Sequence, residues 1–276
     1  MNPGSTETRA TSLAAPRVRP GRPADRRQRE WLVAAAFALA AVVAWPAAAR
    51  AEITFEAFTG VSDTSSADLR VSQPAAGNDF TVKDLSFDDR SFDPAPYYGF
   101  RAMYFFERFP WLGVGAEWFH FKIYGETADT RRIAGTRGDV PYDVTGPVDS
   151  TVQRFNLPNG VSYVTVDVMA RHGWFRDPDE YPGGRLQAYL GGGVGPVIAY
   201  PVSVIEGIRT TPGYEVAGVG VQGFAGIRVM LFKHLGVFLE GKLTHSSLTV
   251  GVARGGEASL DETTRHLVGG ITLAIP

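Results

Sequence analysis

The feature that most constrains the fold of this chain is a series of eight short segments in which apolar and polar residues alternate. They are predicted at 53–60, 97–106, 112–124, 161–171, 185–196, 217–231, 236–245 and 264–275. The connectors after the first, third, fifth and seventh segments hold 36, 36, 20 and 18 residues, whereas the other three hold 5, 13 and 4. Short periplasmic turns alternating with long extracellular loops are typical of a transmembrane barrel. We therefore predict an all-β fold, an eight-stranded antiparallel transmembrane β-barrel.

One face of each predicted strand is apolar and uncharged. In 217–231, Val221 and Ile227 lie on one face and Gln222 and Arg228 on the other, because successive side chains of a strand point to opposite faces. A soluble sandwich would also alternate, with its apolar faces packed together. Aromatic residues gathered at strand ends, as in an interfacial girdle, and the alternating connector lengths favour the membrane barrel.

The first 51 residues have the pattern of a secretion signal. Residues 1–30 hold seven arginines, and residues 31–49 are apolar and uncharged. Ala49-Arg50-Ala51 supplies the small-x-small pattern of a signal-peptidase site. We predict a basic n-region and signal peptide at 1–51, cleaved after Ala51, and one barrel domain at 52–276 in the outer membrane of a Gram-negative bacterium. The alternative is a retained helix, since 19 apolar residues can span ~30 Å of hydrocarbon.

The chain after the leader is acidic and contains no cysteine. Residues 52–276 hold 19 basic and 26 acidic residues, a formal charge of −7, which argues against nucleic acid as a partner. Without cysteine there is neither a disulfide nor a thiolate metal site, and we predict no metal site. The expected partners are outer-membrane lipids including lipid A, and the barrel-assembly machinery during insertion. The chain ends Leu273-Ala274-Ile275-Pro276 instead of in an aromatic residue, which weakens the predicted assembly signal.

Charged residues recur on the predicted inward faces. An eight-stranded barrel is too narrow for an aqueous channel, so side chains should fill its interior. Unpaired charges would be costly there, and we predict a connected network of ion pairs that holds the barrel together. Its predicted members are Glu56, Arg101, Glu117, Asp167, Arg171, Arg228, Glu240 and Lys242.

The segment 112–124 departs from the alternation. Its even positions are apolar up to Trp118, yet His120 and Lys122 are also even. Either the strand bulges near Phe119 and turns both residues into the mouth of the barrel, as bulges beside active sites do, or both lie at headgroup level. A cationic pair at that level would suit a phosphorylated or acidic lipid, whereas ordinary snorkelling would need no ligand.

A histidine and a serine lie two residues apart, at His245 and Ser247, on one outward face near the outer rim. The pair resembles the His-x-Ser of outer-membrane lipid A 3-O-deacylases, in which the serine attacks an acyl ester and the histidine accepts its proton. Leu248 stands where that family usually has Asn. The candidate acids that would orient the histidine are Glu257, Asp261 and Glu262.

A second resemblance covers the whole chain after the leader. The segment 91–124 is similar to the corresponding part of the lipid A oxidase group of small outer-membrane barrels, with its Ser-Phe…Pro-x-Tyr-Tyr-Gly and the Glu-x-x-His-x-Lys-x-Tyr of 117–124. The segments 212–216 and 238–243 are similar too. The resemblance implies an oxidoreductase that converts the proximal glucosamine of lipid A to 2-aminogluconate with O2 as co-substrate, while any further cofactor is unknown.

The same resemblance places a candidate site at the extracellular ends of the second and third strands. The candidate catalytic residues are Tyr98, Glu117, His120 and Lys122, and the candidate substrate-binding residues are Asp88, Asp89 and Ser91 from the first loop. Glu117 or His120 would take a proton from the anomeric hydroxyl, and Lys122 would hold a phosphate or carboxylate. The competing interpretation is a non-enzymatic structural or interaction barrel that uses the acidic loops 61–96 and 125–160, since a fold does not fix a function.

Overall fold

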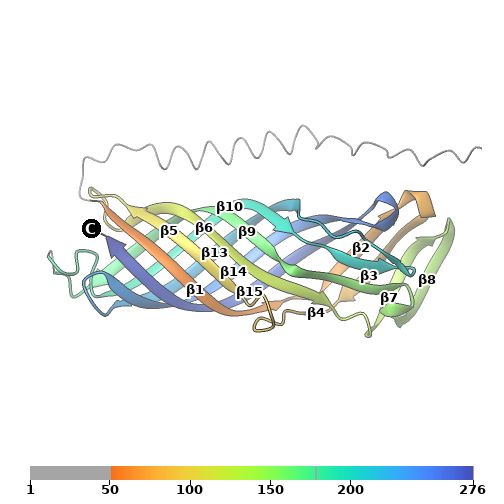
Figure 1. Cartoon of the computed structure of the whole chain (residues 1–276), viewed down its shortest axis with the longest axis horizontal. Helices are drawn as coiled ribbons and strands as arrows, with labels where there is room; N and C mark the ends of the chain where they lie inside the picture. Colours follow the sequence, from red (N-terminus) through yellow and green to blue (C-terminus); the bar gives the residue numbers. More distant parts are fainter. Residues whose placement is uncertain (1–50, 178, 276) are drawn as a thin grey trace, which may run out of the picture.

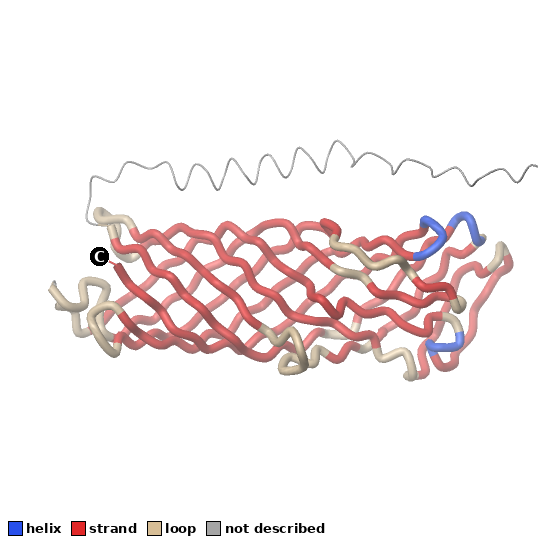
Figure 2. Tube along the Cα trace, in the orientation of Figure 1, coloured by secondary structure: helices blue, strands red, loops and turns tan. Residues whose placement is uncertain are grey.

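The structure is a computed structural model that describes residues 51–177 and 179–275. The predicted signal peptide lies outside the described residues except for Ala51. Strands make up most of the described chain, and three short 3-10 turns lie together at one end of the molecule (Figure 2). Among the described residues, no helix is both long and apolar enough to cross a membrane.

Eight antiparallel strands close into a barrel, as predicted. They are β1 (Glu52–Thr64), β5 (Tyr98–Phe105), β6 (Leu112–Gly125), β9 (Val152–Trp174), β10 (Leu186–Ala199), β13 (Glu215–Met230), β14 (Leu235–Val252) and β15 (Gly256–Ile275). Each pairs with the next in this order, and β1 pairs with β15 to complete the ring. The strands are tilted against the barrel axis, and the start of β1 lies at the same end as the C-terminus (Figure 1).

Several strands continue beyond their predicted outer ends. We predicted strands at 161–171 and 236–245, but β9 spans Val152–Trp174 and β14 spans Leu235–Val252. The extensions form because the long connectors are themselves folded into strands, which supply hydrogen-bond partners beyond the membrane. The predicted strand ends were set from apolar residues at alternate, lipid-facing positions, and this pattern stops at the membrane surface.

The additional strands build an extracellular cap on the barrel. They are β2 (Ala67–Gln73), β3 (Asn78–Leu85), β4 (Phe87–Asp88), β7 (Thr130–Arg137), β8 (Val140–Pro147), β11 (Val202–Ile205) and β12 (Ile208–Arg209). β2 pairs with the outer end of β15, and the sheet continues through β3 and β7 to β8. β11 pairs with the outer end of β9. We call these strands, with the outer ends of β9, β14 and β15, the cap; in Figure 1 it lies opposite the C-terminal end.

The outer surface of the barrel is apolar over its membrane portion. Leu190 is 64% exposed, Ile227 53% and Ile271 56%, although all three are large apolar side chains. Their exposure would be unfavourable in water and is favourable against lipid acyl chains. This band and the filled polar interior identify a transmembrane barrel and exclude the soluble sandwich.

The interior changes character along the barrel axis. At membrane level its buried residues include the charged Arg101, Glu117, Arg228 and Lys242 together with apolar side chains such as Phe224. Inside the cap most of the buried residues are apolar, and they include Leu69, Val71, Phe80, Val82, Ile133, Val152, Phe155, Leu157, Leu248 and Val250. The apolar residues of the cap are continuous with those inside the barrel in one hydrophobic cluster, and the membrane portion is held together by polar contacts as well.

Candidate functional site

Arg101 on β5 is the centre of a buried ion-pair network. Its guanidinium contacts the carboxylates of Glu56 at 3.0 Å, Glu117 at 2.5 Å and Glu240 at 2.7 Å. Arg228 donates to Glu56, and Lys242 donates to Glu117. Because three cations meet three carboxylates with no solvent contact, removal of one cation would leave a buried charge without compensation.

The other two predicted members of the network lie apart from it. Asp167 accepts a hydrogen bond from the Gln222 amide at 2.8 Å and forms no ion pair with a described residue. Arg171 lies at the periplasmic end, where it donates to both carboxylate oxygens of Glu52 at 2.6 and 2.8 Å and places its Cζ 3.6 Å from the centre of the Phe105 ring. Charged side chains that all point inward do not meet when they lie at different positions along the barrel axis.

Tyr98 and His120 form a cross-strand pair on the outer face of the barrel. They are direct partners in the β5–β6 register, and their ring centroids lie 5.4 Å apart. The His120 Nδ1 lies 3.3 Å from the Ser162 hydroxyl on β9, and Nε2 has no hydrogen-bond partner among the described residues. His120 is only 5% exposed. The pair thus holds a buried imidazole at the outer rim of the lipid-facing surface.

The irregularity beside His120 belongs to β9 and not to its own strand. On β6 the odd residues Phe119 and Phe121 stay buried inside, so the alternation of β6 is unbroken. The register shifts between Phe121 and Ile123 because the facing chain holds the extra residues 158–160. Gly160 has φ = +103°, and a Cβ there would collide with the His120 ring. Of the two alternatives for this segment, the bulge near Phe119 is therefore wrong, and His120 remains outside the barrel.

Lys122 is buried on the same outer face beneath a segment of the first loop. Its Nζ donates to the backbone carbonyls of Asp93 at 3.1 Å and Pro94 at 3.2 Å, and the side chain is 1% exposed. We call residues 90–97 the cover. Arg90 and Ala95 have φ of 42° and 59°, which is unfavourable for residues other than glycine. A strained segment thus shields a lysine at the membrane rim.

The remaining predicted site residues point in other directions. Glu117 lies inside the barrel and is bound to Arg101 and Lys242, on the opposite face of β6 from His120. Asp89 turns inward and accepts a hydrogen bond from Thr64 at 2.8 Å. The other two stay near the surface, where Asp88 pairs with Arg90 at 2.9 Å and the Ser91 hydroxyl accepts from the backbone of Ser62. Tyr98, His120 and Lys122 are brought together, and Glu117 cannot act with them.

Sequence reasoning missed the residues that hold this site in place. Ser162, Gly160 and the carbonyl groups of Asp93 and Pro94 contact the two basic side chains. Ser162 shares the outward parity of β9, but its pairing with His120 depends on the β6–β9 register. The backbone carbonyls have no signature in the sequence.

The His245 and Ser247 pair does not form a nucleophile with its base. The Ser247 hydroxyl donates to the Asp261 carboxylate at 2.6 Å, and His245 Nδ1 lies 2.9 Å from the Thr263 hydroxyl. Glu262 lies inside the barrel, where it accepts hydrogen bonds from Tyr163 and Ser246. The histidine is thus engaged with another residue, and this geometry does not favour the deacylase.

Comparisons with known proteins return small outer-membrane barrels. No family model and no curated protein matches the chain. Among solved structures, Neisserial surface protein A is 9% identical, with 81% of this chain and 96% of that chain covered and a TM-score of 0.38. Outer membrane protein OprG of Pseudomonas aeruginosa is 13% identical (82% and 96% covered, TM-score 0.34), and outer membrane protein AlkL is 12% identical (84% and 95%, TM-score 0.34).

These likenesses are too distant to carry an argument about function. In this structure, membrane insertion is indicated by the closed ring of eight strands, the exposed apolar band and the charged interior. Only a closed barrel satisfies all strand hydrogen bonds within a bilayer, and barrels of this form belong to the Gram-negative outer membrane. The chain is accordingly a small outer-membrane β-barrel protein.

Proposed function

We propose that the protein acts on lipid A at the outer face of β5 and β6, and that it oxidises the proximal glucosamine to 2-aminogluconate. The observation that supports this is the position of His120 and Lys122. Two basic side chains are buried on the lipid-facing side of β6 at the outer rim, where Lys122 lies under the strained cover and His120 lies beside Tyr98. The Lys122 ammonium has three N–H donors and gives two of them to carbonyl groups, so the third would serve an anionic lipid headgroup once the cover lifts.

The lipid-facing aromatic residues give this site an orientation. Phe100 and Trp118 stack with an interplanar angle of 6° just below Tyr98, and Phe100 is 55% exposed. Acyl chains would lie against these rings, and the sugars would lie at the level of His120 and Lys122. Phe92 on the cover is 74% exposed and would meet the same lipid surface.

His120 is the residue that fits proton transfer in this proposal. Its Nδ1 is held by Ser162, and its Nε2 has no partner among the described residues, which leaves it for a sugar hydroxyl. In the proposed reaction the anomeric carbon transfers its hydrogen with two electrons to O2, the hydroxyl proton passes by way of His120 to the resulting peroxide, and H2O2 leaves. Water opens the resulting lactone, so the product gains one oxygen atom. Tyr98 positions the imidazole through ring contact.

The test uses the refolded barrel with 1-dephosphorylated lipid A in air and under nitrogen, followed by mass spectrometry. We expect a product one oxygen heavier in air only. His120→Gln and Lys122→Met should abolish it, while His172→Gln, at the exposed periplasmic end of β9, should not. Undiminished product from both site variants, or none from the unmodified protein, would overturn the proposal; loss of an acyl chain would instead support the deacylase.

One observation favours the interaction barrel as a second candidate. The cap extends the sheet far beyond the membrane and buries many apolar residues, which is more structure than a lipid-modifying rim requires. Such a rigid projection would suit contact with partners outside the cell. Binding of intact cells or matrix by the protein without any change in lipid A mass would support this candidate over the oxidase.

A further inference from the structure

A second polar feature lies directly beyond Lys122 on the same outer face. A cavity of about 470 Å³ opens at the outer ends of β6 and β9, a volume in the usual range of small-ligand sites. The residues that matter for its chemistry are Arg90, Tyr124, Glu126, Arg154 and Asn156. Tyr124 follows Lys122 at the next outward position of β6, so the cavity continues the strip formed by Trp118, His120 and Lys122.

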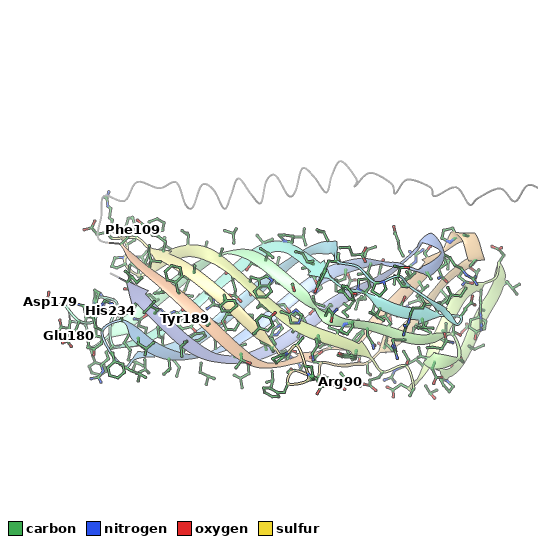
Figure 3. The ribbon with its side chains drawn as sticks, viewed as in Figure 1. Arg90, Phe109, Asp179, Glu180, Tyr189 and His234 are labelled. Carbon is green, nitrogen blue, oxygen red and sulfur yellow. The ribbon has the colours of Figure 1, made fainter. Side chains whose placement is uncertain are left out.

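Arg90 is held in a defined position at one wall of this cavity. Its Nε donates to Asp88 at 2.9 Å, and its Cζ lies 4.6 Å from the centre of the Tyr124 ring. The two terminal guanidinium nitrogens donate to no described residue. Figure 3 shows Arg90 at the outer edge of the barrel, far along the axis from His234 and Asp179 at the periplasmic end. Asp88 therefore orients one edge of the Arg90 guanidinium, and the other edge is free to bind a ligand.

Arg154 supplies a second cation from another strand. Its backbone pairs with Val204 of β11, and its exposed side chain forms no ion pair or hydrogen bond with any described residue. The charged groups around the cavity are these two arginines and Glu126 on its wall, with Asp88 already paired to Arg90 and Lys122 held by carbonyl groups. The Asp93 carboxylate also lies near Arg90 and Tyr124. An anion placed between the arginines would therefore meet two carboxylates, Glu126 and Asp93, that form no ion pair with a described residue.

The chemistry and the position together define the class of ligand. Guanidinium groups bind phosphate oxygens in pairs and are the usual choice where a planar, two-point contact is needed. The Asn156 side chain, at the same wall, offers the amide donor and acceptor that sugar hydroxyls require. We propose that this cavity binds a phosphorylated saccharide, with Arg90 and Arg154 holding the phosphate and Asn156 contacting the sugar.

The proposal rests on the proposed function only in taking the outer leaflet as a source of ligand. Binding needs neither the cover to lift nor any reaction at His120. A phosphorylated sugar could arrive either as the headgroup of an outer-leaflet glycolipid or as a soluble molecule, and both present the same phosphate to the two arginines.

The experiment measures binding by the complete barrel in phosphatidylcholine nanodiscs, with glucosamine 6-phosphate, glucosamine and inorganic phosphate as soluble probes. A parallel arm compares binding of the detergent-solubilised barrel to vesicles with and without lipopolysaccharide. Arg154→Gln and Arg90→Gln should each weaken binding by roughly tenfold or more, as loss of a charge-assisted hydrogen bond does. Arg132→Gln on β7, an exposed arginine on another part of the cap, should leave binding unchanged.

The outcomes separate cleanly. Binding of the phosphosugar but not of glucosamine supports a soluble ligand. Binding only to lipopolysaccharide vesicles supports a lipid-borne ligand. Either result upholds the phosphate site if both arginine variants lose that binding. Binding that survives both substitutions, or absence of binding to every phosphate probe, overturns the inference. Retained binding without lipid A oxidation would refute the proposed function alone, and oxidation together with phosphate binding that does not depend on the arginines would refute the site alone.

Discussion

Glu206 and Arg137 are joined across two extracellular loops, with the Arg137 Nε 2.6 Å from a Glu206 carboxylate oxygen. The other carboxylate oxygen accepts from the Asn78 amide at 3.1 Å and lies 3.8 Å from Arg254. Asn78 belongs to the first long connector, Arg137 to the second, Glu206 to the third and Arg254 to the fourth. One carboxylate of the third loop therefore contacts the other three extracellular loops.

Glu206→Gln should loosen the cap without opening the barrel. Partial burial raises the pKa of Glu206, but hydrogen bonds from Asn78 and Arg137 outweigh this and hold the pKa below its ordinary value of 4.5. Its contribution to stability is thus present above pH 4.5 and is lost as the pH falls through the lowered pKa. Hydrogen exchange at pH 7 should become faster around residues 78, 137 and 254. Glu257→Gln, in an exposed position, serves as the control, and equal exchange in both variants would contradict the role of Glu206.

Arg101→Met should destabilise the membrane portion strongly. The substitution leaves Glu56, Glu117 and Glu240 without their shared cation in a dry interior, and breaking a buried ion pair costs about 3–5 kcal/mol. Urea unfolding in lipid vesicles, followed by tryptophan fluorescence, measures the change. Arg132→Met removes an exposed ion pair and should give no measurable change. If the two variants unfold at the same urea concentration, the network does not stabilise the barrel.

Asp89 should make attachment of the cover pH-dependent. Burial raises the pKa of Asp89 from 3.8 to about 6, with hydrogen bonds from Thr64 opposing part of the rise. The folded state then holds this proton more tightly than the unfolded state. The stability of the folded cover is therefore highest below about pH 4. It falls by about 3 kcal/mol in total between pH 4 and 6 and does not change further above pH 6.

The check is hydrogen exchange of residues 86–97 at pH 5 and pH 8, corrected for intrinsic rates. Asp89→Asn should remove the difference in protection between the two pH values, and Asp143→Asn on β8 should preserve it. Protection of this segment that is independent of pH in the unmodified protein would rule the effect out.

Phe80→Ala should unfold the cap and spare the barrel. Phe80 on β3 is 1% exposed within the apolar cluster, and truncation of a buried phenylalanine costs about 3–5 kcal/mol. Limited proteolysis should then cut β2, β3 and β7. Heated and unheated samples should still migrate differently on a gel, which marks an intact barrel. Val140→Ala, at a side chain that is 62% exposed, should resist cleavage. Loss of the gel shift in Phe80→Ala would show that cap and barrel fold as one unit.

Several features of the protein were determined by the sequence alone. The period of two in segments such as 217–231 specified eight strands and their lipid-facing sides, because a strand offers only two faces and lipid admits only one kind of residue. The same parity placed Arg101, Glu117 and Lys242 inside. These are local properties of the chain, so they can be read without knowing which strands are neighbours.

The tertiary structure decided what touches what. Register placed Tyr98 beside His120 and put Gly160 against the imidazole, while the strand faces separated Glu117 from both. The folding of the long loops into a cap, and the meeting of four of them at Glu206, likewise depend on pairings between residues as far apart as Asn78 and Arg254. Alternation along one strand carries no information about register or loop packing, because these are set by contacts between segments distant in sequence.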